Sequence, residues 1–115
     1  MSAHTLARPV LCGMFELDAS GTVIFSRVDA DGPTGGPAPD LKGRNFFDEA
    51  ADFSNAAELR RRVNLFRASA AQADSFDFTC EYDDGLVPVR ILLARIRERA
   101  DYDTNSVLIH VRRRN

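Results

Sequence analysis

The part of the chain that most constrains its fold is residues 75–113, where apolar and polar side chains alternate in three successive segments. The first of these segments, residues 75–82, reads SFDFTCEY. Its apolar positions are Phe76, Phe78, Cys80 and Tyr82. A period of two is typical of a strand that buries one of its faces. Only DDG at 83–85 and RADYDTN at 99–105 interrupt the pattern, so we expect three adjacent antiparallel strands joined by short loops.

The second and third segments predict which side chains point toward the core. In LVPVRILLARIR, residues 86–97, one face carries Val87, Val89, Ile91 and Leu93. In SVLIHVRR, residues 106–113, the corresponding face carries Val107, Ile109 and Val111. The opposite face also has apolar residues, which are Leu86, Leu92, Ala94, Ile96 and Leu108. An antiparallel sheet is ordinarily wet on one side, so we expect something to cover part of this second face.

The first part of the chain predicts a hairpin and then a loop. Residues 11–18 and 22–26 have the composition of short strands, and DASG at 18–21 is a turn signal between them. The segment DADGPTGGPAPD at 29–40 contains three glycines and three prolines. These residues break regular structure, so we expect a loop there.

The middle of the chain predicts a short helical turn and one longer helix. The turn is expected in GRNFFDEAADF, residues 43–53, and the longer helix within residues 54–71. The candidate caps are Asn45 or Asp48 for the turn and Ser54 or Asn55 for the helix. The apolar stripe of the longer helix, at spacings of four, three and four residues, is Leu59, Val63, Phe66 and Ala70.

This order of elements predicts a single α+β domain over residues 11–115, preceded by an N-terminal segment of residues 1–10. Two strands come before the helices and three come after them. We therefore expect one five-stranded antiparallel sheet with the helices on one of its faces.

The composition excludes several classes of function. The chain has 115 residues and a formal net charge of −2, which gives no general attraction to nucleic acid or to an anionic membrane. No apolar run approaches the roughly 20 residues that a membrane-spanning helix needs. The first residues, MSAHTLARPVLCGMF, are a poor secretory signal. We therefore expect a cytoplasmic protein in which Cys12 and Cys80 remain thiols.

The order of the elements, together with a few local motifs, resembles that of PAS domains. The motifs are LKGRNFFDEAADF at 41–53, NAAEL at 55–59, FDFTCEY at 76–82, VPVRILL at 87–93 and SVLIHVRR at 106–113. They are similar to the photoactive yellow protein branch of PAS domains, which has a Gly-basic-Asn-Phe-Phe element followed by an acid and a small apolar pair. The likeness covers about residues 8–113. It implies a PAS fold and a sensory module of the kind found in bacterial signalling.

The chain departs from that branch where the chemistry lies. In photoactive yellow protein, a cysteine just after the small apolar pair carries a thioester-linked coumaryl chromophore, and a tyrosine and a glutamate hold its phenolate. The matching positions here are Phe53, Ser26 and Ala30. None of them can do this chemistry, so the resemblance implies a module without a covalent chromophore. The GxNCRFLQ stretch of flavin-binding PAS domains is also missing. We expect no cofactor.

The sequence contains no arrangement of residues typical of an enzyme or a metal site. His4 and His110 are the two histidines, and neither lies in the predicted helix 54–71 from which a haem-binding PAS domain takes its ligand. We interpret His110 as a surface or interface residue. Cys80 alternates with aromatic residues and is expected to be an inert core thiol. The sequence therefore predicts a non-enzymatic module.

Two functions remain open, and they do not exclude each other. In the first, aromatic and aliphatic side chains enclose a pocket for a small apolar ligand that binds without a covalent bond. The candidate residues are Phe25, Phe46, Phe53, Phe66, Phe76, Phe78, Cys80, Val89 and Ile91. In the second, the core is filled and the domain binds proteins. The outer sheet face, with Leu92, Leu108 and His110, would then form a homodimer with the N-terminal segment or bind a signalling partner.

Overall fold

The computed structural model describes residues 12–28, 40–99 and 102–114, with the backbone alone for 97–99 and 102–105. In chain order the elements are β1 (Gly13–Leu17), β2 (Val23–Val28), the π-helical turn η1 (Phe46–Ala50), α1 (Ala56–Ala68), β3 (Ala73–Tyr82), β4 (Gly85–Arg99) and β5 (Tyr102–Arg113). The five strands form one antiparallel sheet in the order β2-β1-β5-β4-β3. The predicted α+β fold with a five-stranded antiparallel sheet is therefore confirmed.

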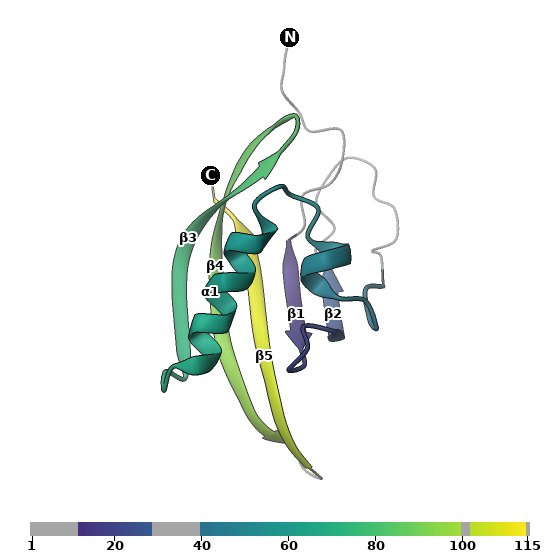
Figure 1. Cartoon of the computed structure of the whole chain (residues 1–115), viewed down its shortest axis with the longest axis vertical. Coiled ribbons are helices and arrows are strands. Elements are labelled where there is room, and N and C mark those ends of the chain that lie inside the picture. The colour runs from purple at the N-terminus through teal and green to yellow at the C-terminus, as the bar shows by residue number, and fades with distance from the viewer. Residues whose placement is uncertain (1–11, 29–39, 100–101, 115) are drawn as a thin grey trace.

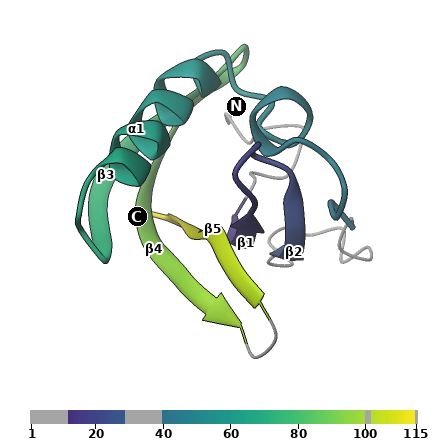
Figure 2. The ribbon, with the colours of Figure 1, turned by 60° about the horizontal axis from the view of Figure 1, so that its bottom comes forward.

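Strand β5 joins the two groups of strands that the sequence predicts. It pairs with β1 on one side and with β4 on the other, so it lies in the centre of the sheet. The sheet is curved, and η1 and α1 both lie on its concave face (Figures 1 and 2). We call this face inner and the opposite face outer. The helices are thus on one face, as the sequence predicts.

The core lies between the inner face of the sheet and the two helices. The alternate residues of the three long strands that were predicted to point inward are all buried, from Phe76 in β3 to Val111 in β5. From α1, the buried residues are Leu59, Val63 and Phe66. From β1, Phe15 and Leu17 are fully buried. These side chains form a single hydrophobic cluster, which is the dominant source of stability for a domain of this size.

A β-bulge between β1 and β2 corrects the prediction for Phe25. Leu17 pairs with Val23, but the preceding Glu16 pairs with Phe25, so one extra residue, Ile24, stands in β2. A bulge of this kind reverses the alternation of the faces beyond it. Val23 is buried, whereas Phe25 shares the outer face with Glu16 and is 47% exposed. The expectation that Phe25 belongs to the core is therefore wrong.

The turn between β1 and β2 forms where DASG predicts it. The Asp18 carboxylate accepts hydrogen bonds from the backbone N–H groups of Ser20 (2.9 Å) and Thr22 (3.0 Å). Gly21 has φ +91°, which glycine adopts at no steric cost. At the other end of β1, Gly13 has φ +145°, and its Cα lies against the backbone of Arg27 and Val28 in β2.

The helical turn and the helix are both present, but their caps differ in kind. Asn45 caps η1, because its side-chain oxygen accepts hydrogen bonds from the N–H groups of Phe47 and Asp48, each at 3.0 Å. Helix α1 begins at Ala56, and no side chain caps it at Asn55. The prediction that Ser54 or Asn55 caps this helix is therefore wrong.

Ser54 and Asn55 instead bind the outer edge of β3. The Asn55 amide donates to the carbonyl of Thr79 at 2.8 Å and its oxygen accepts from the N–H of Glu81 at 3.0 Å. The backbone and hydroxyl of Ser54 both donate to the carbonyl of Glu81, at 2.7 and 3.0 Å. Since β3 is an edge strand, these groups would otherwise depend on water.

The C-terminal end of α1 is held by Arg95 of β4. Its guanidinium donates to the carbonyls of Phe66 (3.0 Å), Ser69 (2.9 Å) and Ala71 (3.3 Å). A cation at this end of a helix satisfies the last carbonyls and interacts favourably with the helix dipole. The helix ends at Ala68, so Ala70 is exposed and does not extend the apolar stripe as predicted.

The expected loop between the last two strands is shorter than the sequence indicates. Strands β4 and β5 continue into residues 99–105, with Glu98 paired to Asp103 and Arg99 to Tyr102.

The boundary predicted between residues 10 and 11 falls outside the described residues. No helix in the described part of the chain has the length and hydrophobicity needed to span a bilayer.

Candidate functional site

Phe53, at the position that matches a chromophore-bearing cysteine in the resemblance, lies in the core. Its side chain is 5% exposed. The centre of its ring lies 6.1 Å from that of Phe78 and 5.9 Å from that of Tyr82, both in edge-on arrangements. Such aromatic pairs stabilise beyond the area they bury. The ring of Phe53 therefore extends from the segment after η1 into the core and packs against strand β3.

The structure brings together most of the residues predicted to line a pocket. Eight of the nine lie in the single buried cluster, and these are Phe46, Phe53, Phe66, Phe76, Phe78, Cys80, Val89 and Ile91. Phe25 lies outside the cluster, on the outer face.

Ser26 and Ala30, which match the phenolate-binding residues in the resemblance, give little information about a pocket. The Ser26 hydroxyl accepts a hydrogen bond from the N–H of Leu41 at 3.4 Å, and Ala30 lies outside the described residues.

A second aromatic group, at the β1 end of the core, includes one residue that the sequence analysis missed. The ring of Phe46 lies 5.1 Å from that of Phe15 and 5.3 Å from that of Phe47. Phe15 is fully buried. The alternation of Gly13, Phe15 and Leu17 in GMFEL was the signal that could have placed it in the core.

Cys80 has the environment expected of an inert thiol. Burial raises the pKa of this thiol to about 12, and the nearby Cys12 and Asp52 add to the shift. A thiol must lose its proton to act as a nucleophile. At neutral pH, Cys80 therefore remains protonated in the folded protein.

This pKa predicts how Cys80 responds to reagents and to pH. At pH 8, alkylation of Cys80 by iodoacetamide should be slow in the folded protein and fast in urea, as followed by mass spectrometry. The folded pKa is above the unfolded value of roughly 8.5. The protonated Cys80 thiol therefore contributes its full stabilisation of the folded state below about pH 8.5. This contribution is lost as the pH rises toward 12, because the unfolded chain releases the proton more readily. Urea midpoints of the wild type should fall toward those of Cys80→Ala between pH 9 and 11. Fast alkylation in the native state would contradict this placement.

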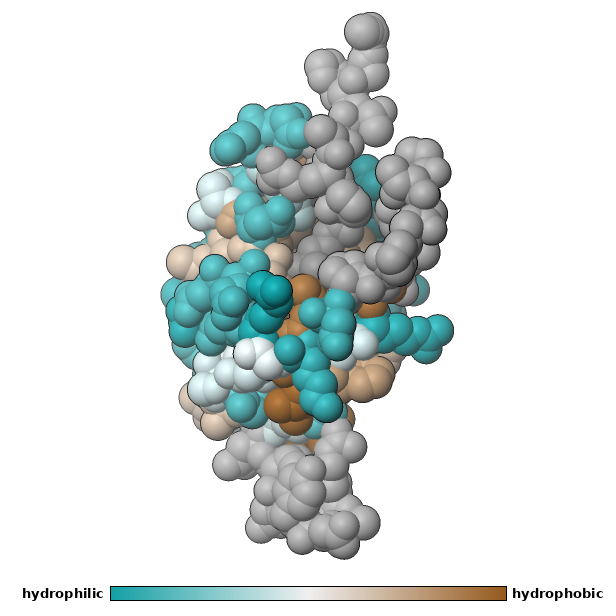
Figure 3. All heavy atoms as spheres, turned by 90° about the vertical axis from the view of Figure 1, so that its right-hand side faces the viewer, coloured by the Kyte–Doolittle hydropathy of each residue, from teal (hydrophilic) through white to brown (hydrophobic). Residues whose placement is uncertain are grey.

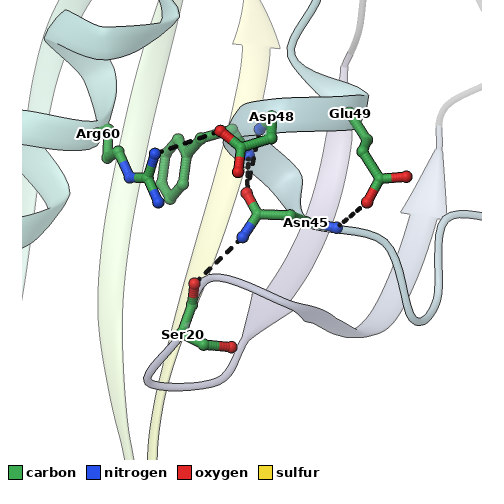
Figure 4. A network of polar contacts seen from close by, with 6 residues as sticks. Ser20, Asn45, Asp48, Glu49 and Arg60 are labelled. Atoms are coloured by element: carbon green, nitrogen blue, oxygen red, sulfur yellow. Dashed lines mark hydrogen bonds and ion pairs between the residues drawn. The ribbon is translucent and has the colours of Figure 1, made fainter.

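Asn45 connects the β1–β2 turn to the helical side of the core (Figure 4). Besides capping η1, its amide donates to the carbonyl of Ser20 at 3.2 Å, and its backbone N–H donates to the Glu49 carboxylate at 3.0 Å. Asp48 in turn accepts from Arg60 of α1 at 3.3 Å. This network explains GRNFF as a structural element that fixes the turn, η1 and α1 relative to one another.

A polar depression of about 230 Å³ lies beside this network. It is formed by the β1–β2 turn, Phe47 and the side chains of Arg60, Asn64 and Arg67. Arg67 donates to the carbonyl of Asp18 at 2.5 Å. Burial acts to raise the pKa of Asp18, but hydrogen bonds from Ser20 and Thr22 outweigh it, so this pKa lies below its usual value. The charged groups here already have partners, which indicates a structural role.

The outer face of the sheet brings together the three predicted interface residues. Leu92 of β4 lies opposite His110 of β5, and Leu108 lies one position along the same face. Leu92 is 38% exposed, whereas Leu108 and His110 are half-buried. Their predicted place on the outer face is confirmed. Their role in an interface stays a prediction.

Two polar pairs on this face were not anticipated from the sequence. The Ser106 hydroxyl donates to the Glu16 carboxylate at 2.6 Å, and both residues are buried. Arg90 and Arg112 lie directly opposite each other on β4 and β5. Both pairs join residues that only strand pairing brings together, so no local motif marks them.

Where described residues form the surface on the side of β2 and η1, small hydrophobic areas lie between hydrophilic ones (Figure 3). Within residues 12–28, 40–99 and 102–114, no three His, Cys, Asp or Glu side chains gather as a metal site would require.

No model of a known protein family matches this chain. The chain is similar to photoactive yellow protein from Halochromatium salexigens, with 30% identity over 70 residues. The matched part is 61% of this chain and 56% of that relative, so the chain spans little more than half of the relative it matches. Together with the α+β architecture, this similarity supports a relationship to photoactive yellow protein and to PAS-like sensory domains.

Proposed function

We propose that this protein is a PAS-like signalling module that acts by binding another protein and holds no covalently attached chromophore. The similarity to photoactive yellow protein supports the sensory class. We propose further that this module has no enzymatic activity. Binding of a small apolar ligand in the core, the other function that the sequence leaves open, is favoured by no specific contact among the described residues.

The observation that carries the proposal is the packing of Phe53. Its ring lies in edge-on contact with Phe78 and Tyr82. A phenylalanine has no nucleophilic atom, so it cannot form a thioester. The two thiols of the chain, Cys12 and Cys80, are both buried, and burial keeps Cys80 protonated. At the place where relatives in the resemblance attach a chromophore, the core of this protein is therefore packed with its own side chains.

The module should be colourless, which an absorption spectrum and native mass spectrometry of the purified protein would test. We expect no absorption band above those of the aromatic residues and a mass equal to that of the polypeptide. An activated coumaryl thioester should leave the folded protein unlabelled. The same reagent should label the urea-unfolded chain, which serves as the control because unfolding exposes both thiols. A visible band that survives denaturation would refute the proposal.

The homodimer predicted from the sequence stays a prediction. Residues 1–10, which were expected to take part in it, lie outside the described residues. The outer face around Leu92 and Leu108 is the surface that the sequence indicates for this assembly, so a partner of another kind bound there would exclude the homodimer.

A further inference from the structure

We propose that the outer sheet face around Arg90 and Arg112 binds a segment of a partner polypeptide that combines acidic and apolar side chains. This inference rests on the proposed function as a binding module and adds the chemistry of the partner. The sheet has an unfavourable feature on this face. Arg90 and Arg112 are paired across β4 and β5, and both are exposed. Like charges directly opposite each other destabilise a sheet.

The charges around this pair are only partly compensated. Asp77 of β3 lies opposite Arg90 and forms ion pairs of 3.3 Å with Arg90 and with Arg114. One carboxylate thus serves two guanidinium groups, while Arg112 forms no ion pair with any described residue. Arg27 of β2 adds a further positive charge to the row that contains His110. The excess positive charge contrasts with the net charge of −2 of the whole chain.

The same residues surround a depression of about 260 Å³. It is lined by Ser75, Arg90, Leu92, His110 and Arg112. Pockets that enclose a whole small ligand usually measure roughly 300–1,000 Å³. This one is smaller and open, so it fits one or two side chains of a larger partner. Guanidinium groups hold carboxylates in paired hydrogen bonds, and Leu92 at 38% exposure offers an apolar contact beside them.

The apolar contact continues away from the arginines. Leu108 lies opposite both Glu16 of β1 and Ala94 of β4, and Met14 lies opposite His110. Along the strands, the exposed cationic side chains thus give way to half-buried apolar ones, where the Glu16 carboxylate is already held by Ser106. A segment with an acidic side chain next to an apolar one matches both parts at once.

The charge argues against a second copy of this chain as the occupant. A two-fold contact repeats the same patch on both partners. Centred here, it would place Arg90 and Arg112 against themselves, and like charges facing each other in an interface are strongly unfavourable. An acidic partner removes this repulsion, whereas a homodimer at this place increases it. A nucleic acid is disfavoured by the overall negative charge of the chain.

The test measures binding of fluorescent peptides by anisotropy at low salt. The probe is an eight-residue peptide of alternating glutamate and leucine, and the comparison probes are the lysine–leucine peptide and a single-stranded oligonucleotide. We expect saturable binding of the glutamate peptide alone. Arg90→Gln combined with Arg112→Gln should weaken it at least about tenfold, because both substitutions remove charge-assisted hydrogen bonds to the glutamate carboxylates.

A matched control removes two charges elsewhere. Arg44→Gln combined with Arg61→Gln changes exposed residues on the helical side, which pair with Glu49 and Glu58. This double variant should bind the glutamate peptide like the wild type. If both double variants weakened peptide binding equally, the loss would come from the lower net charge and not from this site, and the inference would be overturned. Circular dichroism of each variant checks that it remains folded, since exposed ion pairs contribute little to stability.

The remaining outcomes separate this inference from the proposed function. Failure of the glutamate peptide to bind, or tighter binding of the oligonucleotide, overturns the acidic partner and leaves the colourless module intact. Light scattering of the wild type and of Leu92→Asp measures the oligomeric state. A wild-type dimer that Leu92→Asp converts to a monomer would mean that a second copy covers this face, and it too would overturn the inference. A visible chromophore would instead refute the proposed function.

Discussion

Replacing Phe46 with alanine is expected to lower the free energy of unfolding by about 3–5 kcal/mol. The side chain is fully buried, and its ring contacts those of Phe15 and Phe47. The surrounding backbone is also fixed, because the N–H of Phe46 donates to the carbonyl of Gly21 at 2.9 Å and its carbonyl accepts from Ala51 at 2.7 Å. A site held on several sides relaxes little, so a cavity would remain.

Urea unfolding followed by circular dichroism measures this loss. Phe25→Ala is the matched control, since it removes the same ring from a side chain that is 47% exposed. We expect it to cost less than about 1 kcal/mol. Similar losses for the two variants would show that the bulge in β2 does not turn Phe25 outward. A loss below about 1 kcal/mol for Phe46→Ala would contradict the placement of η1 on the core.

The second large effect concerns Gly13, where the backbones of β1 and β2 approach closely. A Cβ atom at this position would lie 2.2 Å from the carbonyl oxygen of Arg27 and 2.9 Å from the Cα of Val28. Both are backbone atoms of a paired strand, so neither can move without disturbing the sheet. The φ angle of +145° adds strain for any residue with a side chain. Gly13→Ala is therefore expected to cost at least about 2 kcal/mol.

Gly43→Ala separates the two causes of this loss. Gly43 also has a positive φ, +90°, but a Cβ there would meet nothing within 4 Å. Its cost should be that of backbone strain alone, about 1–2 kcal/mol. Thermal and urea melts of the two variants provide the comparison. If Gly13→Ala proved no more destabilising than Gly43→Ala, the close approach of the two strands would be wrong.

Much of this fold could be predicted from the sequence because the three long strands bury one face each. Alternation in SFDFTCEY and its two successors follows directly from the geometry of a strand, so the inward residues of β3, β4 and β5 were correctly assigned. Three of the four predicted stripe residues of α1, Leu59, Val63 and Phe66, followed in the same way from the helical period, whereas Ala70 lies beyond the end of the helix. These are local patterns, and tertiary contacts reinforce them.

The errors occur where tertiary contacts override a local pattern. A single extra residue in β2 turned Phe25 outward, and a bulge leaves no mark in so short a strand. Asn55 has the composition of a helix cap, yet its side chain bonds to the edge of β3, which lies 24 to 26 residues further along the chain. The candidate interaction surface was only partly predictable for the same reason. Leu92 and Leu108 are apolar at outward positions, but the opposition of Arg90 and Arg112 depends on the register of two strands.

The central position of β5 has a consequence for how the chain folds. The β1–β2 and β3–β4 hairpins share no strand pairing except through β5, which lies between them. Glu16 and Ser106, which meet across this junction, are separated by 90 residues. Closing so long a loop must precede the contacts that compensate for its entropy. Contacts of high sequence separation slow folding, so the two halves remain unjoined as a sheet until β5 has been synthesised and inserted between them.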